Sequence, residues 1–190
     1  MIQLVVDSTA AVPKDFLEQH DNVHVIPLFI SVKGEYVPEN EATIEQVIEY
    51  SESTKKAVST SQPSTGDFLK LFESLPKEDP VIVICITSGV SGTYNGAVLA
   101  ARQSGRKQIA VINSRTTAVG MMEVLEDGLD MIEKGLSFEE ISKGLQESAS
   151  LMRTTFTVPT LDYLRRGGRV GKAAGLIGSI LKIKPVIFLN

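Results

Sequence analysis

The sequence predicts an α/β protein. Residues 1–150 are expected to form a three-layer α/β/α domain with a parallel sheet, and residues 151–190 to begin a second, smaller α/β domain. Short apolar strands alternate with helices along the first part, which is typical of a sheet covered by helices. Residues 81–86 form a continuous apolar, largely β-branched run. Such a run is typical of a central strand that is buried on both faces.

The division at residue 150 is predicted from charge. Residues 1–150 carry 12 Lys and Arg against 22 Asp and Glu, whereas residues 151–190 carry 7 against 1. A segment of about 40 residues is too short to bury a stable core alone. The apolar stretches 154–158 and 184–189 have no evident sheet partners, so we expect residues 151–190 to be the incomplete start of a second domain.

The individual elements follow from apolar patterns and capping signals. Strands are predicted over residues 2–6, 23–32, 81–86, 109–112, 154–158 and 184–189. Helices are predicted over residues 13–19, 43–53, 64–75, 94–103, 118–134, 137–152, 160–166 and 171–181. Pro27 restricts its strand to an edge or a bulge, and residues 60–64 are expected to be a polar loop. The helix over 171–181 is almost entirely small or aliphatic, so we expect it to be buried or to face an apolar ligand.

Composition excludes several classes of protein. The net charge of −4 argues against general binding of nucleic acid, and a single cysteine, Cys85, excludes an internal disulfide framework. No apolar run approaches the length of a membrane-spanning helix, and residues 1–4 do not resemble a signal peptide. We therefore expect a cytoplasmic protein without stable membrane insertion. His20 and His24 lack partners at metal-ligand spacing, so no metal site is predicted.

Hydroxyl-rich turns follow several of the predicted strands. Residues 7–9, 87–92 and 113–114 are such turns, and Thr60 and Ser61 add another cluster at a helix entrance. The carboxyl ends of parallel strands meet at one edge of a sheet, where ligands bind. Hydroxyl groups and helix N-termini together favour an anion without needing Lys or Arg. The alternative is that all these side chains only cap helices.

Ser91 lies between a strand and a helix, as the nucleophile of a hydrolase does. The usual glycine two residues after such a serine is Thr93 here, and both His20 and His24 precede Ser91. The hydrolase order of serine, acid and histidine is therefore impossible within this chain. A Ser-dependent acyl hydrolase remains an alternative only through a Ser/Lys pair.

Arg165, Arg166 and Arg169 surround two glycines and form a basic loop. This loop is either a solvated turn or a contact for an anion or a partner. The positive charge of residues 151–190 favours the second interpretation.

Four motifs occur in order along the chain: 7–10 with Pro13, 60–64, 91–95 and 164–169. Together they resemble the motifs of the bacterial DegV family of fatty-acid-binding proteins. The resemblance implies an α/β/α domain with a parallel sheet and a smaller domain with a mixed sheet, with the fatty acid between them. It implies that Thr60 and Ser91 bind the carboxylate, with Ser61 and the Gly92 N–H as helpers.

The resemblance also implies a biological role. Family members act as the binding subunit of a fatty acid kinase, which leads to phospholipid synthesis. They present a long-chain fatty acid to a separate catalytic subunit that forms an acyl phosphate with ATP. The chain would then be a carrier without a cofactor, its arginine loop would meet the kinase or its nucleotide, and the 171–181 helix would line the acyl tunnel.

The chain also departs from the family pattern. The later strands of the second domain, and a family histidine near the head group, have no counterpart here. We therefore expect the C-terminal part of the family fold to be absent. A further alternative is an interaction module that has lost the lipid pocket.

Overall fold

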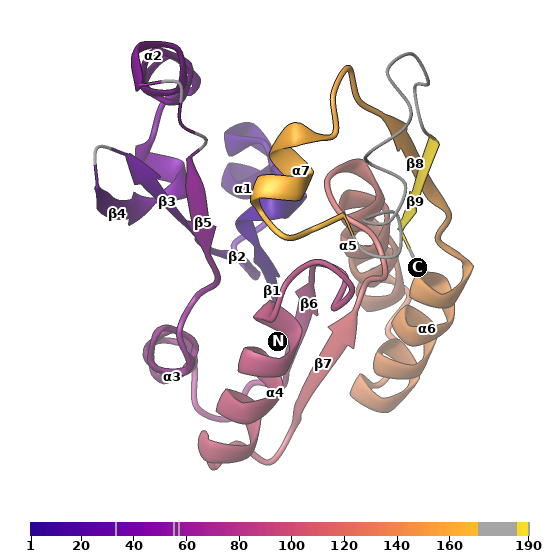
Figure 1. Cartoon of the computed structure of the whole chain (residues 1–190). Coiled ribbons are helices and arrows are strands. Elements are labelled where there is room, and N and C mark those ends of the chain that lie inside the picture. Colours follow the sequence, from indigo (N-terminus) through magenta and orange to yellow (C-terminus); the bar gives the residue numbers. More distant parts are fainter. Residues whose placement is uncertain (33, 55, 57, 171–185, 190) are drawn as a thin grey trace.

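The computed structural model describes residues 1–32, 34–54, 56, 58–170 and 186–189 (Figure 1). The strands are β1 (Gln3–Asp7), β2 (Val23–Ile26), β3 (Phe29–Val32), β4 (Glu35–Pro38), β5 (Ser59–Ser61), β6 (Val81–Cys85), β7 (Ile109–Asn113), β8 (Thr154–Thr157) and β9 (Val186–Leu189). The helices are α1 (Lys14–Gln19), α2 (Ile44–Thr54), α3 (Thr65–Ser74), α4 (Thr93–Gln103), α5 (Val119–Glu133), α6 (Phe138–Leu151) and α7 (Asp162–Arg166), with short 3-10 helices η1 (Ser8–Ala10) and η2 (Glu39–Glu41).

The main sheet has the strand order β2-β1-β6-β7, and all its neighbouring strands are parallel. The chain leaves β1 toward β2 on one side and returns to β6 on the other. The connection therefore changes direction between β1 and β6, and ligands of open α/β sheets bind outside the carboxyl ends of strands at such a point. The parallel sheet flanked by helices confirms the predicted fold class.

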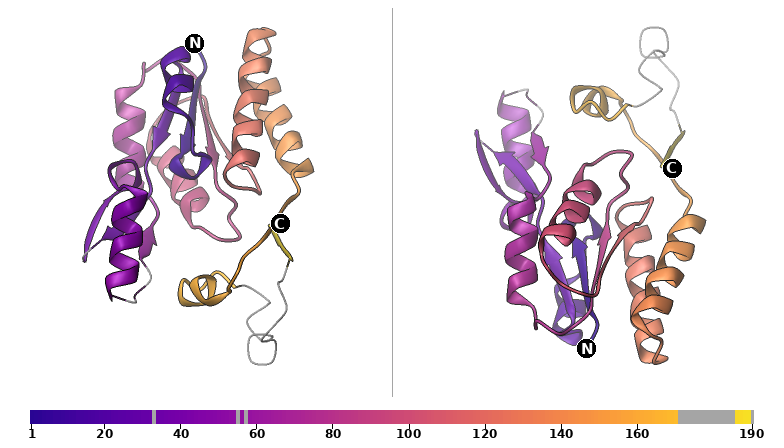
Figure 2. Two further views of the ribbon diagram at one scale, coloured as in Figure 1. Left: turned by 90° about the horizontal axis from the view of Figure 1, so that it is seen from above. Right: turned by 90° about the horizontal axis from the view of Figure 1, so that it is seen from below.

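Alternating side chains of the strands divide the core into two apolar layers. Leu4 and Ile84 face one layer with α1, α5 and α6, whereas Val5 and Val83 face the other with α3 and α4. Figure 2 shows α5 and α6, in salmon and orange, together on one side of the sheet. Every residue of β6 is buried, as predicted for a strand covered on both faces.

The predicted strand over residues 23–32 is wrong as a single element. It forms β2 and β3, which belong to different sheets, and Pro27 and Leu28 lie between them in neither strand. The backbone N–H of Leu28 donates to Ser8 Oγ at 2.9 Å, which ties this break to the end of β1. Proline has no backbone N–H to donate to a neighbouring strand, so the strand is interrupted at Pro27, the residue that was expected to restrict it.

A small antiparallel sheet of order β4-β3-β5 was not predicted. Thr60 and Ser61, expected in a loop, end strand β5, where Thr60 pairs with Ile30 of β3. All three residues of β5 are exposed and polar, so they carry no apolar alternation that would indicate a strand. Figure 1 shows this small sheet and α2 at one side of the molecule.

The expectation that the two apolar stretches after residue 150 lack sheet partners is wrong. They contain β8 and β9, which pair with each other in antiparallel register. The predicted helix over 171–181 lies outside the described residues. The assignment of residues 151–190 to a second domain stays a prediction. In the described part of the chain, none of the helices combines the length and apolar character needed to span a membrane.

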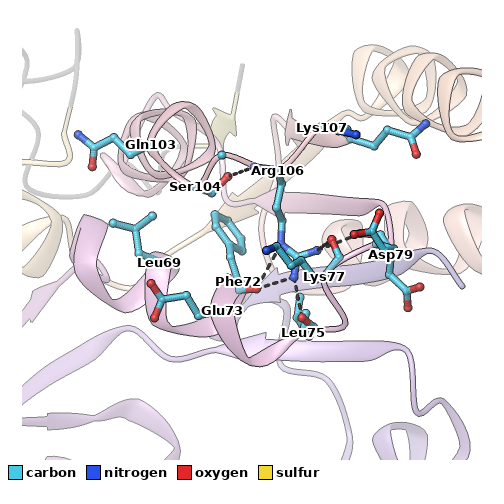
Figure 3. Close-up of a pocket in the computed structure, with 13 residues that line it drawn as sticks. Leu69, Phe72, Glu73, Leu75, Lys77, Asp79, Gln103, Ser104, Arg106 and Lys107 are labelled. Carbon is cyan, nitrogen blue, oxygen red and sulfur yellow. Dashed lines mark hydrogen bonds between the residues drawn. The ribbon is translucent and has the colours of Figure 1, made fainter.

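A cavity of about 450 Å³ lies at the amino ends of the strands, between the end of α3 and the end of α4 (Figure 3). The Arg106 side chain crosses this cavity, and its N–H groups donate hydrogen bonds to backbone carbonyls. The guanidinium donates to Phe72 O at 2.6 Å, to Leu75 O at 2.7 Å and to Asp79 O at 3.0 Å. These carbonyls belong to the last turn of α3 and the loop after it, so Arg106 acts as a C-terminal cap.

Replacing Arg106 with alanine should destabilise the domain. Several carbonyls around the end of α3 would lose their donor at once, so we expect the free energy of unfolding to fall by about 2 kcal/mol. Urea unfolding measures this change. The exposed neighbour variant Lys107→Ala is the matched control and should stay within about 0.5 kcal/mol of wild type. Equal stability of both variants would show that the carbonyls do not depend on Arg106.

Candidate functional site

Polar turns after three strands of the main sheet meet at its carboxyl edge. Ser88, after β6, donates its backbone N–H to Asn113 Oδ1 at 3.2 Å, and Asn113 Nδ2 donates to Ser88 Oγ at 2.8 Å. Thr87 N donates to Thr116 O at 3.0 Å. After β1, the carbonyl of Thr9 accepts from the backbone N–H of Ala118 at 2.9 Å. The predicted convergence of these turns is confirmed.

Asp7 lies at the point where the sheet connection changes direction. Its side chain is buried, and its Oδ2 accepts from the backbone N–H of Ile86 at 2.7 Å. Its Oδ1 accepts from the backbone N–H of Thr9 at 3.1 Å and from the Thr9 hydroxyl. Burial raises the pKa of the Asp7 carboxyl, these hydrogen bonds oppose the rise, and the nearby Glu39 carboxylate adds to it. Asp7 therefore joins β1 to the turn that follows β6.

Ser91 and Gly92 directly precede helix α4. The Ser91 hydroxyl is hydrogen-bonded to the Thr93 hydroxyl at 2.8 Å and accepts from Thr93 N at 3.3 Å. Gly92 is the N-cap residue of α4 and offers no capping side chain. Backbone N–H groups in the first turn of a helix lack intrahelical partners and attract anions. Ser91 and Gly92 therefore lie directly before a helix N-terminus of this kind.

Thr60 and Ser61 lie on β5. The residue after them, Gln62, contacts the start of α4. A Cβ atom on Gly92 would lie 2.1 Å from Gln62 Oε1, so the Gln62 side chain rests directly on the start of the helix. Sequence reasoning placed Gln62 in a motif but gave it no role. The structure thus brings together the chain segments of two predicted pairs, Thr60 with Ser61 and Ser91 with Gly92.

The hydroxyls of Thr60 and Ser61 differ in their surroundings. Ser61 Oγ donates to the carbonyl of Gln62 at 3.2 Å, whereas no described residue is hydrogen-bonded to the Thr60 hydroxyl. Successive side chains of a strand point to opposite faces. The two hydroxyls therefore do not act as an equivalent pair, and Thr60 is the one available to a ligand.

The three arginines of the basic loop have different contacts. Arg169 Nε donates to Val90 O at 3.2 Å, so this side chain reaches the turn that carries Ser91. Arg165 forms an exposed ion pair with Asp162 at 3.5 Å. Arg166 borders a hollow of about 280 Å³ between α2 and α7, whose other lining residues are Ser51, Glu52, Lys56 and Tyr163.

Neither histidine contacts Ser91. His20 Nδ1 is hydrogen-bonded to Phe16 O at 2.8 Å, and His24 Nε2 is hydrogen-bonded to Gln3 Oε1 at 2.7 Å. The described residues therefore bring no histidine base to the Ser91 hydroxyl. Cys85 is fully buried, and burial raises the pKa of its thiol well above its ordinary value, as expected for an inert core cysteine.

The fold is a parallel α/β domain whose carboxyl edge carries hydroxyl-rich turns and the N-terminus of α4. The family model described as "Uncharacterised protein, DegV family" matches residues 1–190, so the chain belongs to the DegV family. A DegV domain-containing protein of Staphylococcus aureus (strain COL) is 36% identical over 185 residues, which are 96% of this chain and 65% of that protein. The chain thus spans less than two thirds of that relative's length.

Two solved structures share the fold over the whole chain. One is described as fatty acid binding of a DegV family protein from Thermus thermophilus; it has a TM-score of 0.88 and 30% identity, with 68% of that chain covered. The other is described as a stearic acid-binding protein from Eubacterium ventriosum; it has a TM-score of 0.85 and 34% identity, with 67% covered. These similarities confirm the resemblance that the motifs indicated.

The raised pKa of Asp7 predicts a pH dependence of stability. Between the ordinary aspartate pKa of about 3.9 and the raised value, the folded state holds more bound protons than the unfolded state. The contribution of Asp7 is therefore complete below the ordinary pKa, and it is lost as pH rises through the raised value. Urea unfolding across acidic to neutral pH should show this decline in wild type.

The variant Asp7→Asn cannot titrate, so the stability difference between wild type and Asp7→Asn should shrink as pH rises. Asp15→Asn, at an exposed position of α1, is the control for the loss of one carboxylate. Parallel curves for wild type and Asp7→Asn would contradict a raised pKa at this position.

Proposed function

We propose that this chain binds a long-chain fatty acid and acts as a carrier. The observation that carries the proposal is the contact of Gln62 with Gly92, which brings the β5 hydroxyls to the N-terminus of α4. Both segments lie with the polar turns at the carboxyl edge of the sheet, where α/β proteins bind ligands. DegV relatives that are described as fatty-acid-binding proteins support the identity of the ligand.

In this proposal the fatty acid carboxylate lies between Thr60 and Ser91. The Thr60 hydroxyl donates from β5, the Ser91 hydroxyl from the start of α4, and the Gly92 N–H adds the field of the helix N-terminus. Ser61 helps by holding the end of β5 through its bond to Gln62 O. Neutral donors bind the carboxylate without burying it in an ion pair, so its oxygen atoms stay nucleophilic.

The carrier role follows from the nucleophilic carboxylate oxygens. A separate kinase subunit would bring ATP, a carboxylate oxygen would attack the γ-phosphorus, and the bond to the ADP oxygen would break to leave acyl phosphate and ADP. This chain would contribute no catalytic residue and no cofactor, and it would work in the cytoplasm, where ATP is available. The exposed Arg165 and Arg166 fit a contact with that partner or its nucleotide.

Native mass spectrometry of freshly purified protein tests the proposal directly. We expect a bound mass that matches a long-chain fatty acid, released when the protein is denatured. A protein that carries no lipid, and that takes up no oleate when it is added, would overturn the proposal in favour of an interaction module without a lipid pocket.

Substitution of the carboxylate donors should weaken binding without unfolding the domain. A hydrogen bond to a charged group contributes about 1.5–3 kcal/mol, so Ser91→Ala and Thr60→Ala should each lower oleate affinity by roughly tenfold or more. Isothermal titration calorimetry measures the affinity, and the melting temperature reports the fold. Ser59→Ala, also on exposed β5, is the matched control. Wild-type affinity in the Ser91 and Thr60 variants would remove both residues from the site.

Arg166 and Arg169 of the arginine loop should have different functions. Arg166→Glu should impair acyl phosphate formation with the kinase subunit while oleate affinity stays within about twofold of wild type. Arg169→Glu should reduce both, because Arg169 holds the carbonyl of Val90 in the turn before Ser91. Parallel measurements of turnover and oleate affinity distinguish the two variants. Equal loss of affinity in both would place the whole loop at the ligand.

A further inference from the structure

We propose that Gln62 is a positioning residue, which sets the distance between Thr60 and Ser91 by filling a slot on the surface of α4. The inference rests on the proposed function, because it concerns the same carboxylate site. Gln62 lies two residues after Thr60, and its side chain rests on the residue that follows Ser91. The three atoms nearest to a Cβ built on Gly92 all belong to the Gln62 side chain.

The slot is made by two glycines on one face of α4. Gly92 and Gly96 are four residues apart, so they lie one turn apart on the same side of the helix. A Cβ atom on Gly92 would lie 2.1 Å from Gln62 Oε1 and 3.1 Å from Gln62 Cδ. A Cβ atom on Gly96 would lie 3.4 Å from Gln62 Nε2. The absence of side chains at these two positions is what allows the glutamine to lie against the backbone.

The contact is one of shape rather than of hydrogen bonding. Among the described residues, none is hydrogen-bonded to the side-chain amide of Gln62. Pro63, the next residue, is buried and has a fixed φ angle, and its carbonyl lies 3.8 Å from the Cβ position of Gly96. The segment from Thr60 to Pro63 is therefore held against α4 at Gln62, with a stiff residue after it.

This arrangement matters because two donors must reach one carboxylate. Thr60 comes from the small sheet and Ser91 from the main sheet, so their separation depends on how the two sheets are held together. Misplacement of a binding group by about 1 Å is enough to lose most of its effect on a bound ligand. Release of Gln62 from the slot should move Thr60 away from Ser91 while both residues remain intact.

Gly92 provides a way to release Gln62 without removing it. The backbone of Gly92 has a φ of −81°, which alanine adopts without strain. The three atoms nearest to an alanine Cβ there all belong to the movable end of the Gln62 side chain. Gly92→Ala keeps the backbone N–H of residue 92 and should expel the glutamine from the slot.

The test is a double-mutant cycle with two ligands, oleate and oleyl alcohol. Gln62→Ala and Gly92→Ala should each lower oleate affinity by about tenfold, and the double variant should lose no more than either single variant. Affinity for oleyl alcohol, which lacks the carboxylate, should stay close to wild type in all three. Gly66→Ala is the matched control, because its Cβ would meet only Ser64 Oγ at an ordinary 3.6 Å.

Gln62→Met separates positioning from direct binding. Methionine has a similar length and shape but no amide, so it should restore oleate affinity if Gln62 acts by filling the slot. Failure of methionine to restore affinity, additive losses in the double variant, or unchanged affinity in Gln62→Ala would each overturn the inference. A wild-type protein that binds no oleate would instead overturn the proposed function, so the two failures are distinguishable.

Discussion

The buried carboxylate of Asp7 holds together the end of the molecule on which the site depends. Its acceptance of the Ile86 N–H fixes the start of the turn that leads to Ser91. The neighbouring Ser8 accepts the N–H of Leu28 and donates to Glu39, which fixes the entry to the small sheet. The turn that leads to Ser91 and the entry to the small sheet are therefore both held by two consecutive residues, Asp7 and Ser8, at the end of β1. Desolvation of this carboxylate is the cost, and three hydrogen bonds offset part of it.

The two ends of the main sheet have different roles. At the amino end, the guanidinium of Arg106 donates to backbone carbonyls and caps the last turn of α3. At the carboxyl end, the hydroxyl of Thr60 and the first turn of α4 have donors that the described protein does not fully use. The first arrangement contributes stability, and the second is the one that the proposed carboxylate site uses. This separation lets the loops around the site differ without weakening the core.

Much of the main domain was predictable because its signals are local. The buried run of β6 and the helices expected to start at residues 64 and 137 are present, and the two helices begin with capping boxes at Ser64 and Ser137. The small sheet was missed because β5 is polar and exposed, and because β2 and β3 are adjacent in sequence but separate in space. The hydroxyl turns of the site were predictable from strand ends. Gln62 was not, because its role depends on two glycines some 30 residues later, and such a contact leaves no local pattern.

The burial of Cys85 has a practical consequence. It is the one cysteine of the chain, it lies wholly inside the layer between the main sheet and α3, and its thiol stays protonated. A maleimide reagent therefore has no native target on the folded surface. A cysteine introduced at an exposed position of α2 or α7 would take up a fluorophore selectively in the otherwise unmodified protein. One such label on each of α2 and α7 would report whether the distance between the two helices changes when oleate is added.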